Sequence, residues 1–109
     1  AQIFAAAATA LAADRRVALV ASAHSSAALT IGAPLGLREE AIGFDRMLIE
    51  TLATDVGALA RVAPDAWSAV GSCGLAPLVA LARCMEGVSF EVLEHRCPYG
   101  VGYTVARSL

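Results

Sequence analysis

The sequence predicts an α/β fold in which helices cover a sheet in a three-layer arrangement. The run Val17–Ala21 is continuously apolar and lacks alternation, which is typical of a strand buried on both faces. Helical segments follow this run, and two extended segments, Val88–Leu93 and Val101–Ala106, come last. An order of helix, strand, helices and two strands is typical of layered α/β proteins.

The first third of the sequence predicts a helix, the buried strand and a loop. Residues Ile3–Ala13 are mostly alanine, which has the highest intrinsic helix propensity. After the strand, Ser22–Gly36 is rich in Ser, Thr, Gly and Pro, a composition typical of loops. Open α/β sheets bind ligands at the carboxyl ends of buried strands, so we expect any ligand near Ser22–Ser26.

The middle of the sequence predicts helices. Arg38–Leu52 is amphipathic, with apolar residues at three- and four-residue spacings on one face: Ala41, Phe44, Leu48 and Leu52. Glu39 and Glu40 at its start suit the positive end of the helix dipole better than a catalytic carboxylate pair. A shorter helix over Asp55–Val62 is expected to end before Pro64, which cannot continue a helix.

The last third predicts two more helices and a pair of strands. A helix that starts near Ala66 can break at Gly71–Gly74, and Leu75–Met85 is predicted to be a buried helix. The segment Val88–Leu93 is predicted to alternate as a strand, with apolar side chains on one face: Val88, Phe90 and Val92. A turn at residues 96–100 leads to the last strand.

Composition limits the class of protein. The chain of 109 residues is expected to form one domain or part-domain over 1–109, and its 58% hydrophobic and 17% charged content excludes disorder. A net charge of −2 and eight scattered arginines, with no lysine, exclude a nucleic-acid binder. The uncharged segment Val17–Leu37 contains too many Ser, Gly and Pro residues to span a membrane, so a soluble, cytoplasmic protein is expected.

The apolar content predicts a partner surface. A chain of this length buries only about two thirds of its unfolded surface. The strand at Val17 would also expose an apolar edge unless other strands flank it. The expected partner is a second polypeptide, a missing N-terminal segment of the same fold, or another copy in a homo-oligomer.

The cysteines form no recognisable framework. Their number is odd and no C-x-x-C spacing occurs, which excludes a full disulfide framework and a zinc site: Cys73, Cys84 and Cys97. Buried free thiols in a reducing compartment are the expected state.

The two histidines lack the surroundings of a catalytic motif. His24 lies beside Ser22, Ser25 and Ser26, but no nucleophile-elbow motif is present, so a hydrogen-bonded loop histidine is favoured over a nucleophile–base pair. His95 lies at a strand end between charged residues and is expected to be solvated, without a metal-binding role.

Several short motifs occur in a fixed order: Ala21-Ser22, Ala33–Gly36, Gly43–Asp45, Gly71–Leu75 and Cys97–Tyr103. Together they resemble the C-terminal part of the class III extradiol ring-cleavage dioxygenases, in the LigB-type branch related to the Memo-like proteins. That branch has approximately S-G-D-L-S-H-x-L-T, G-A-P-x-G, E-F-D, G-E-C-G-L and Y-E-G-P-F-G-V-G-Y. The resemblance covers residues 17–106, and P-[FY]-G-V-G-Y is its most specific part.

The resemblance implies a non-haem Fe(II) held by two His and one Glu, with another His as acid–base during opening of a catecholic ring. This sequence departs from that pattern. Ala27 stands at the acid–base His position, His24 at the family's Asp and Ser72 at the Glu ligand, while Ser22 and Ser26 match. The two metal-binding His belong to the N-terminal half of the family. A methyl cannot transfer protons and a hydroxyl is a poor Fe(II) ligand, so the usual mechanism is not expected here.

We therefore expect a dioxygenase-like protein that is catalytically inactive and acts as a binding or assembly module, without catalytic residues, cofactor, or stoichiometric iron or zinc. The alternative is an active Fe(II) ring-cleaving dioxygenase whose ligands come from a missing segment or a second chain. A plain α/β domain with an accidental resemblance is the third reading. The candidate ligand cleft comprises Ser22, His24, Ser26, Ser72 and Cys73, and it requires His24 to approach the turn at Gly71–Gly74.

Overall fold

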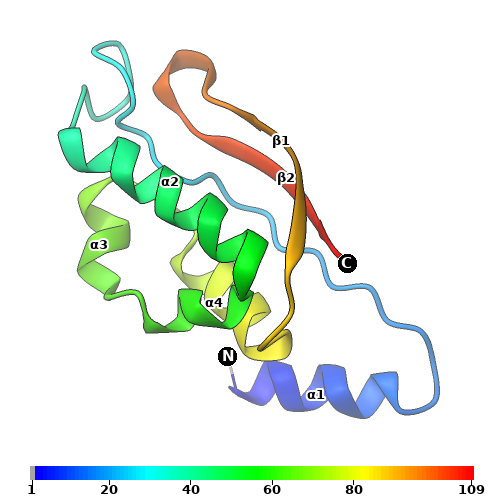
Figure 1. Cartoon of the computed structure of the whole chain (residues 1–109). Helices are drawn as coiled ribbons and strands as arrows, with labels where there is room; N and C mark the ends of the chain where they lie inside the picture. Colours follow the sequence, from blue (N-terminus) through cyan, green and yellow to red (C-terminus); the bar gives the residue numbers. More distant parts are fainter. Residues whose placement is uncertain (1) are drawn as a thin grey trace.

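The computed structural model describes residues 2–109 and combines helices with a two-stranded antiparallel sheet (Figure 1). Its elements are α1 (Gln2–Ala12), α2 (Glu39–Thr54), the 3-10 helix η1 (Val56–Arg61), α3 (Pro64–Ala69), α4 (Leu75–Cys84), β1 (Phe90–Arg96), the 3-10 helix η2 (Pro98–Gly100) and β2 (Tyr103–Ser108). None of the helices in this range is long and apolar enough to cross a membrane. The mixture of helices and strands is confirmed, whereas a three-layer arrangement needs further strands and stays a prediction.

Helix α2 forms the centre of the fold, as its amphipathic pattern predicts. The four residues expected on its core face are all buried: Ala41, Phe44, Leu48 and Leu52. Glu39 and Glu40 lie in the first turn, where carboxylates interact favourably with the helix dipole. The ring of Phe44 packs edge-to-face on Trp67 of α3, with 5.3 Å between centroids and 74° between planes. This aromatic pair joins α2 to α3.

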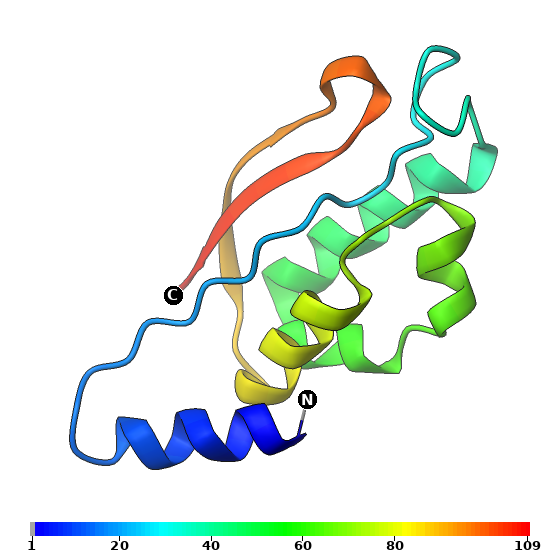
Figure 2. The same cartoon turned by 180° about the vertical axis from the view of Figure 1, so that it is seen from behind.

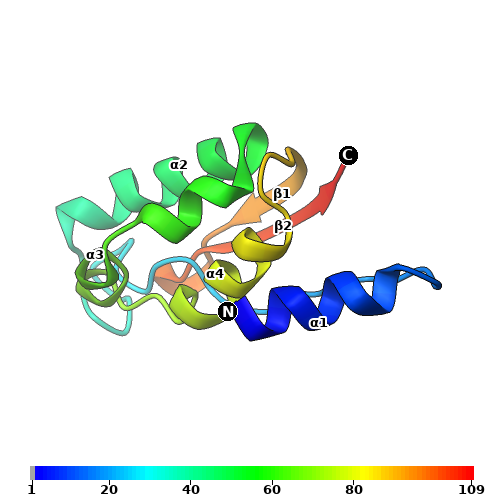
Figure 3. The ribbon, with the colours of Figure 1, turned by 90° about the horizontal axis from the view of Figure 1, so that it is seen from below.

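The sequence predicts a buried helix at Leu75–Met85, and the prediction of its burial is wrong. Helix α4 is present, but Ala82 is its one buried residue. The core lies between α2, η1, α3 and the hairpin, and its fully buried side chains include Val56, Leu59 and Trp67. Helix α4 packs against η1 on one side and against the alanine-rich α1 on another (Figure 3). Small side chains cover little surface, so most residues of α4 stay partly exposed.

The two C-terminal strands pair as an antiparallel hairpin. Phe90 is buried and Val92 is half-buried, which confirms the predicted alternation at the start of β1. A register shift between Val92 and Glu94 then changes which side chains point inward. Both strands begin later than predicted. The Val88 carbonyl accepts a hydrogen bond from the Val56 N–H of η1, and the backbone of residues 100–102 is hydrogen-bonded to the loop before α2, so neither segment is free to extend the hairpin.

The sequence predicts a buried strand at Val17–Ala21, and in the structure of this chain that prediction is wrong. The segment is extended, but among the described residues no backbone N–H of residues 14–23 donates to a backbone carbonyl. Val20 is 91% exposed and Val17 is 39% exposed. The segment runs past the hairpin and α4 without joining a sheet (Figure 2). A strand forms only where a neighbour accepts its hydrogen bonds, and none is present here.

Candidate functional site

Separate parts of the chain meet at residues 25–29. The Ser25 N–H donates to the Gly102 carbonyl at 2.9 Å, which attaches this segment to the turn before β2. The Ala27 N–H donates to the Val70 carbonyl at 2.8 Å, which attaches it to the turn before α4. These bonds bring together three motifs that are far apart in sequence.

His24 is hydrogen-bonded to the turn before α4. Its Nδ1 lies 3.0 Å from Sγ of Cys73, and its Nε2 lies 2.8 Å from the carbonyl oxygen of Gly71. The Ser72 hydroxyl donates to the His24 carbonyl at 3.2 Å and accepts from the Gly74 N–H at 3.1 Å. The expected approach of His24 and Ser72 is therefore confirmed, as is the interpretation of His24 as a hydrogen-bonded loop histidine.

The other two residues of the candidate cleft do not join this cluster. Ser22 is exposed, and no hydrogen bond of its hydroxyl is found in residues 2–109. Ser26 is fully buried, and its Oγ has no hydrogen-bond partner among the described atoms. The structure thus brings together His24, Ser72 and Cys73, and binding of a ligand by them stays a prediction.

A second polar network, which the sequence did not predict, connects Ser25 to α2 and the hairpin. Asp45 is 4% exposed, and its Oδ2 accepts a hydrogen bond from Ser25 Oγ at 2.7 Å. Nε2 of His95 lies 3.6 Å from the same carboxylate oxygen, and Nδ1 of His95 lies 2.8 Å from Oγ1 of Thr104. The network links α2 to both strands of the hairpin. The prediction that His95 is solvated is wrong, since its side chain is only 26% exposed.

One feature of the sequence could have identified Asp45 as a buried carboxylate. It follows Phe44 and precedes Leu48 by three positions, so it lies on the core face of α2. A carboxylate on such a face needs hydrogen-bond donors, because a buried charge without partners is costly. Its Oδ1 is buried and without a partner among the described atoms.

Gly102 has no side chain, and the network occupies the space where a Cβ would lie. A Cβ at this position would overlap Ser25 Oγ and Asp45 Oδ2. Gly100 is similarly restricted, because a Cβ there would overlap Thr30 and Ala33, and its φ is +77°. The two glycines of the P-Y-G-V-G-Y stretch therefore allow close packing of the turn before β2 on the loop.

An open cavity of about 600 Å³ adjoins Asp45 and His95. Its remaining lining combines aliphatic, charged and thiol side chains: Leu29, Ile42, Ile49, Arg46, Glu50 and Cys97. Apolar walls with a few converging polar groups are typical of small-molecule sites. Oδ1 of Asp45 is itself buried, so the cavity meets this residue beside its carboxylate oxygens and not at a free one.

Replacement of Ser25 by alanine is expected to destabilise the chain by about 1–3 kcal/mol, because it removes a donor from the buried carboxylate of Asp45. Ser22→Ala is the matched control, with an expected change within about 0.5 kcal/mol at an exposed site. The midpoints of urea unfolding measure both effects. Equal midpoints for the two variants would contradict the proposed importance of this hydrogen bond.

The residues present do not fit the Fe(II) site that the resemblance implies. The hydroxyl of Ser72, which the resemblance aligns with the Glu ligand, is hydrogen-bonded to the His24 carbonyl and the Gly74 N–H. Ala27, which the resemblance aligns with the acid–base His, has a buried methyl side chain. In the part of the chain that the structure describes, no three His, Cys, Asp or Glu side chains are grouped as metal ligands.

Comparison with known proteins adds no assignment: neither a family model nor a curated protein matches the sequence.

Proposed function

We propose that this chain is the C-terminal part of an extradiol-dioxygenase-like fold, without iron chemistry of its own, that acts as an assembly and binding module. The convergence of the motifs around residues 25–29 supports the relationship. The observation that carries the assembly function is the unpaired, extended segment Val17–Ala21 beside a free sheet edge.

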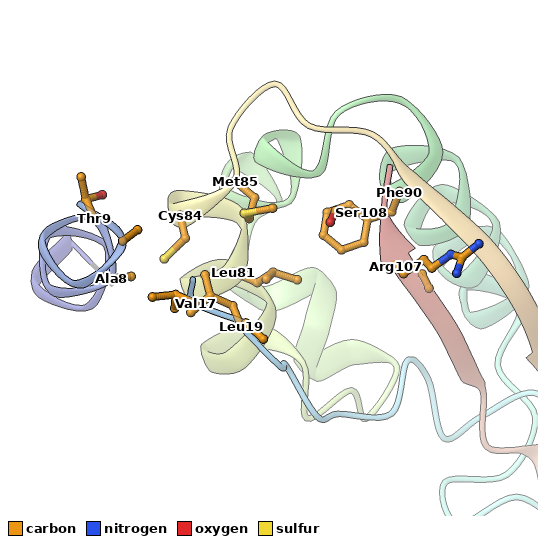
Figure 4. Close-up of a pocket in the computed structure, with 13 residues that line it drawn as sticks. Ala8, Thr9, Val17, Leu19, Leu81, Cys84, Met85, Phe90, Arg107 and Ser108 are labelled. Carbon is orange, nitrogen blue, oxygen red and sulfur yellow. The ribbon is translucent and has the colours of Figure 1, made fainter. Parts of the chain in front are cut away.

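The free edge and the extended segment enclose a wedge-shaped opening. The two run antiparallel and are joined at one end, where Ser25 and Gly102 are hydrogen-bonded. At the other end they diverge around a cavity of about 480 Å³, lined by residues 17–19 and 106–108 together with parts of α1 and α4 (Figure 4). Strand β2 pairs with β1 along one side only, so its other edge faces this opening.

A β-strand from another polypeptide segment is the partner whose chemistry fits this opening. Unpaired N–H and C=O groups on an extended backbone are satisfied best by a second extended backbone. Exposed apolar side chains such as Val17 and Val20 would become covered in the same step. With such strands added, α1 and α2 would lie against a larger sheet in the three-layer arrangement that the resemblance implies.

Sedimentation velocity tests this proposal. At micromolar concentration, the pure chain is expected to self-associate, because a second copy is then the available source of a strand. Val20→Lys is expected to weaken this association at least about tenfold, since a charge on an edge strand opposes pairing. Ile31→Lys, at an equally exposed residue in the loop before α2, is the matched control and should leave association unchanged. A stable monomer of 11.1 kDa would contradict the proposal.

A further inference from the structure

The geometry points to a covalent modification site at Cys73, in which His24 acts as base toward neutral, apolar electrophiles of the α,β-unsaturated aldehyde class. The carbonyl of Gly71 can only accept a hydrogen bond, so Nε2 of His24, at 2.8 Å, carries the ring hydrogen. Nδ1 of the neutral ring is then an acceptor, and Sγ of Cys73 at 3.0 Å is its donor. Nucleophile, base and orienting group are thus in contact.

The surroundings of the sulfur favour its reaction. The backbone N–H of His24 donates to Sγ at 3.2 Å, and this contact persists when the thiol proton has moved to Nδ1. The competing acceptor for the thiol, the His24 carbonyl, is 4.0 Å away. The prediction of buried thiols is wrong for Cys73 and Cys97, which are exposed, so an electrophile can reach Cys73.

The reactant class follows from charge and shape. Residues 17–37 and 66–82, which carry His24 and Cys73, contain no Asp, Glu, Lys or Arg. Arg38, directly after the first segment, donates to the Ala69 carbonyl, so the two segments themselves offer no charged side chain to a charged disulfide or thiol carrier. An apolar groove of about 210 Å³ is lined by residues of the same two segments: Leu19, Val20, Ala21, Pro77, Ala80 and Leu81. It suits the alkyl chain of an unsaturated aldehyde.

The reaction balances without an oxidant or a leaving group. The thiol proton moves from Sγ to Nδ1 of His24, and the sulfur forms a bond to the β-carbon of the aldehyde. The electron pair of the C=C bond shifts toward the carbonyl oxygen. The α-carbon then takes the proton back from His24, which leaves a thioether aldehyde and neutral imidazole.

Competition between the cysteines of the wild-type chain tests the site. The chain is treated with limiting trans-2-nonenal at pH 7, the adducts are reduced, and peptide masses locate them. Cys97 is the internal control, because it is also exposed but forms no hydrogen bond to an imidazole in the described residues. Cys73 is expected to react at least about tenfold faster, since an unassisted thiol is only a few per cent thiolate at this pH. Equal rates would overturn the proposal, whatever the outcome of the assembly experiments.

Variants separate a base from a merely structural histidine. His24→Ala should lower the Cys73 rate to that of Cys97, and added imidazole should restore part of it. Ser68→Ala, at an exposed residue of α3 whose hydroxyl donates to the Asp65 carbonyl in the same helix, is the control and should keep the fast rate. Unchanged reactivity of Cys73 in His24→Ala would overturn the role of the base. If that variant fails to fold, seen as rapid labelling of the half-buried Cys84, the wild-type competition still decides.

Discussion

Replacing Trp67 with alanine is expected to cost about 3–5 kcal/mol of stability, a large share of the roughly 5–15 kcal/mol typical of a domain. The indole is 1% exposed and packs edge-to-face on Phe44. Its loss leaves a cavity between α2 and α3 and removes an aromatic contact from the centre of the core. Urea unfolding followed by circular dichroism measures the change.

Trp67→Phe is the matched control. It keeps an aromatic ring against Phe44 and removes the indole Nε1, which is buried without a partner among the described atoms. The expected cost is less than half that of Trp67→Ala. Similar costs for the two variants would show that the aromatic contact does not hold α2 and α3 together.

Replacing Gly102 with alanine is expected to destabilise the chain by about 3 kcal/mol, because the added methyl must displace Ser25 or the buried carboxylate of Asp45. Both atoms are ends of side chains, but they are buried and hydrogen-bonded to each other, so neither can move aside at little cost. The reduced network should also loosen the attachment of the hairpin to α2. The free energy of unfolding, from urea titration, is the measurement.

Gly43→Ala provides the same chemical change where space is available. Gly43 is exposed within α2, and no atom lies within 4 Å of the position of its missing Cβ. Alanine there is expected to stabilise the chain by about 0.5–1 kcal/mol, because it favours the helix. Opposite signs for the two glycines would support steric restriction at Gly102, and equal effects would contradict it.

Local pattern was sufficient to predict α2 but not the environment of His95. The buried face of α2 follows from the spacing of its own residues, so sequence periodicity defines it. The alternation of β1, extended from Phe90 and Val92, would place His95 on the outer face. The register shift between Val92 and Glu94 reverses this and turns His95 toward Asp45. Nothing in the sequence of β1 indicates the shift.

The segment Val17–Ala21 failed as a predicted strand for a different reason. Its apolar composition indicates burial, but pairing depends on neighbouring strands that the described chain does not provide. The approach of His24 to the turn before α4, in contrast, was expected from the order of the motifs in the resemblance. Contacts between distant segments were therefore predictable only where a family pattern placed them together.

Amide hydrogen exchange as a function of protein concentration tests the proposed assembly most directly. In dilute solution the amides of residues 17–23 are expected to exchange without protection, because they have no backbone acceptor in the described chain. At concentrations where the chain associates, these amides and those on the free edge of β2 should become protected together, while the amides of Ile31 and Gly32, which also lack a backbone acceptor in the described chain, stay unprotected. Association that leaves residues 17–23 unprotected, or protection of these amides already in the dilute monomer, would contradict assembly by strand addition.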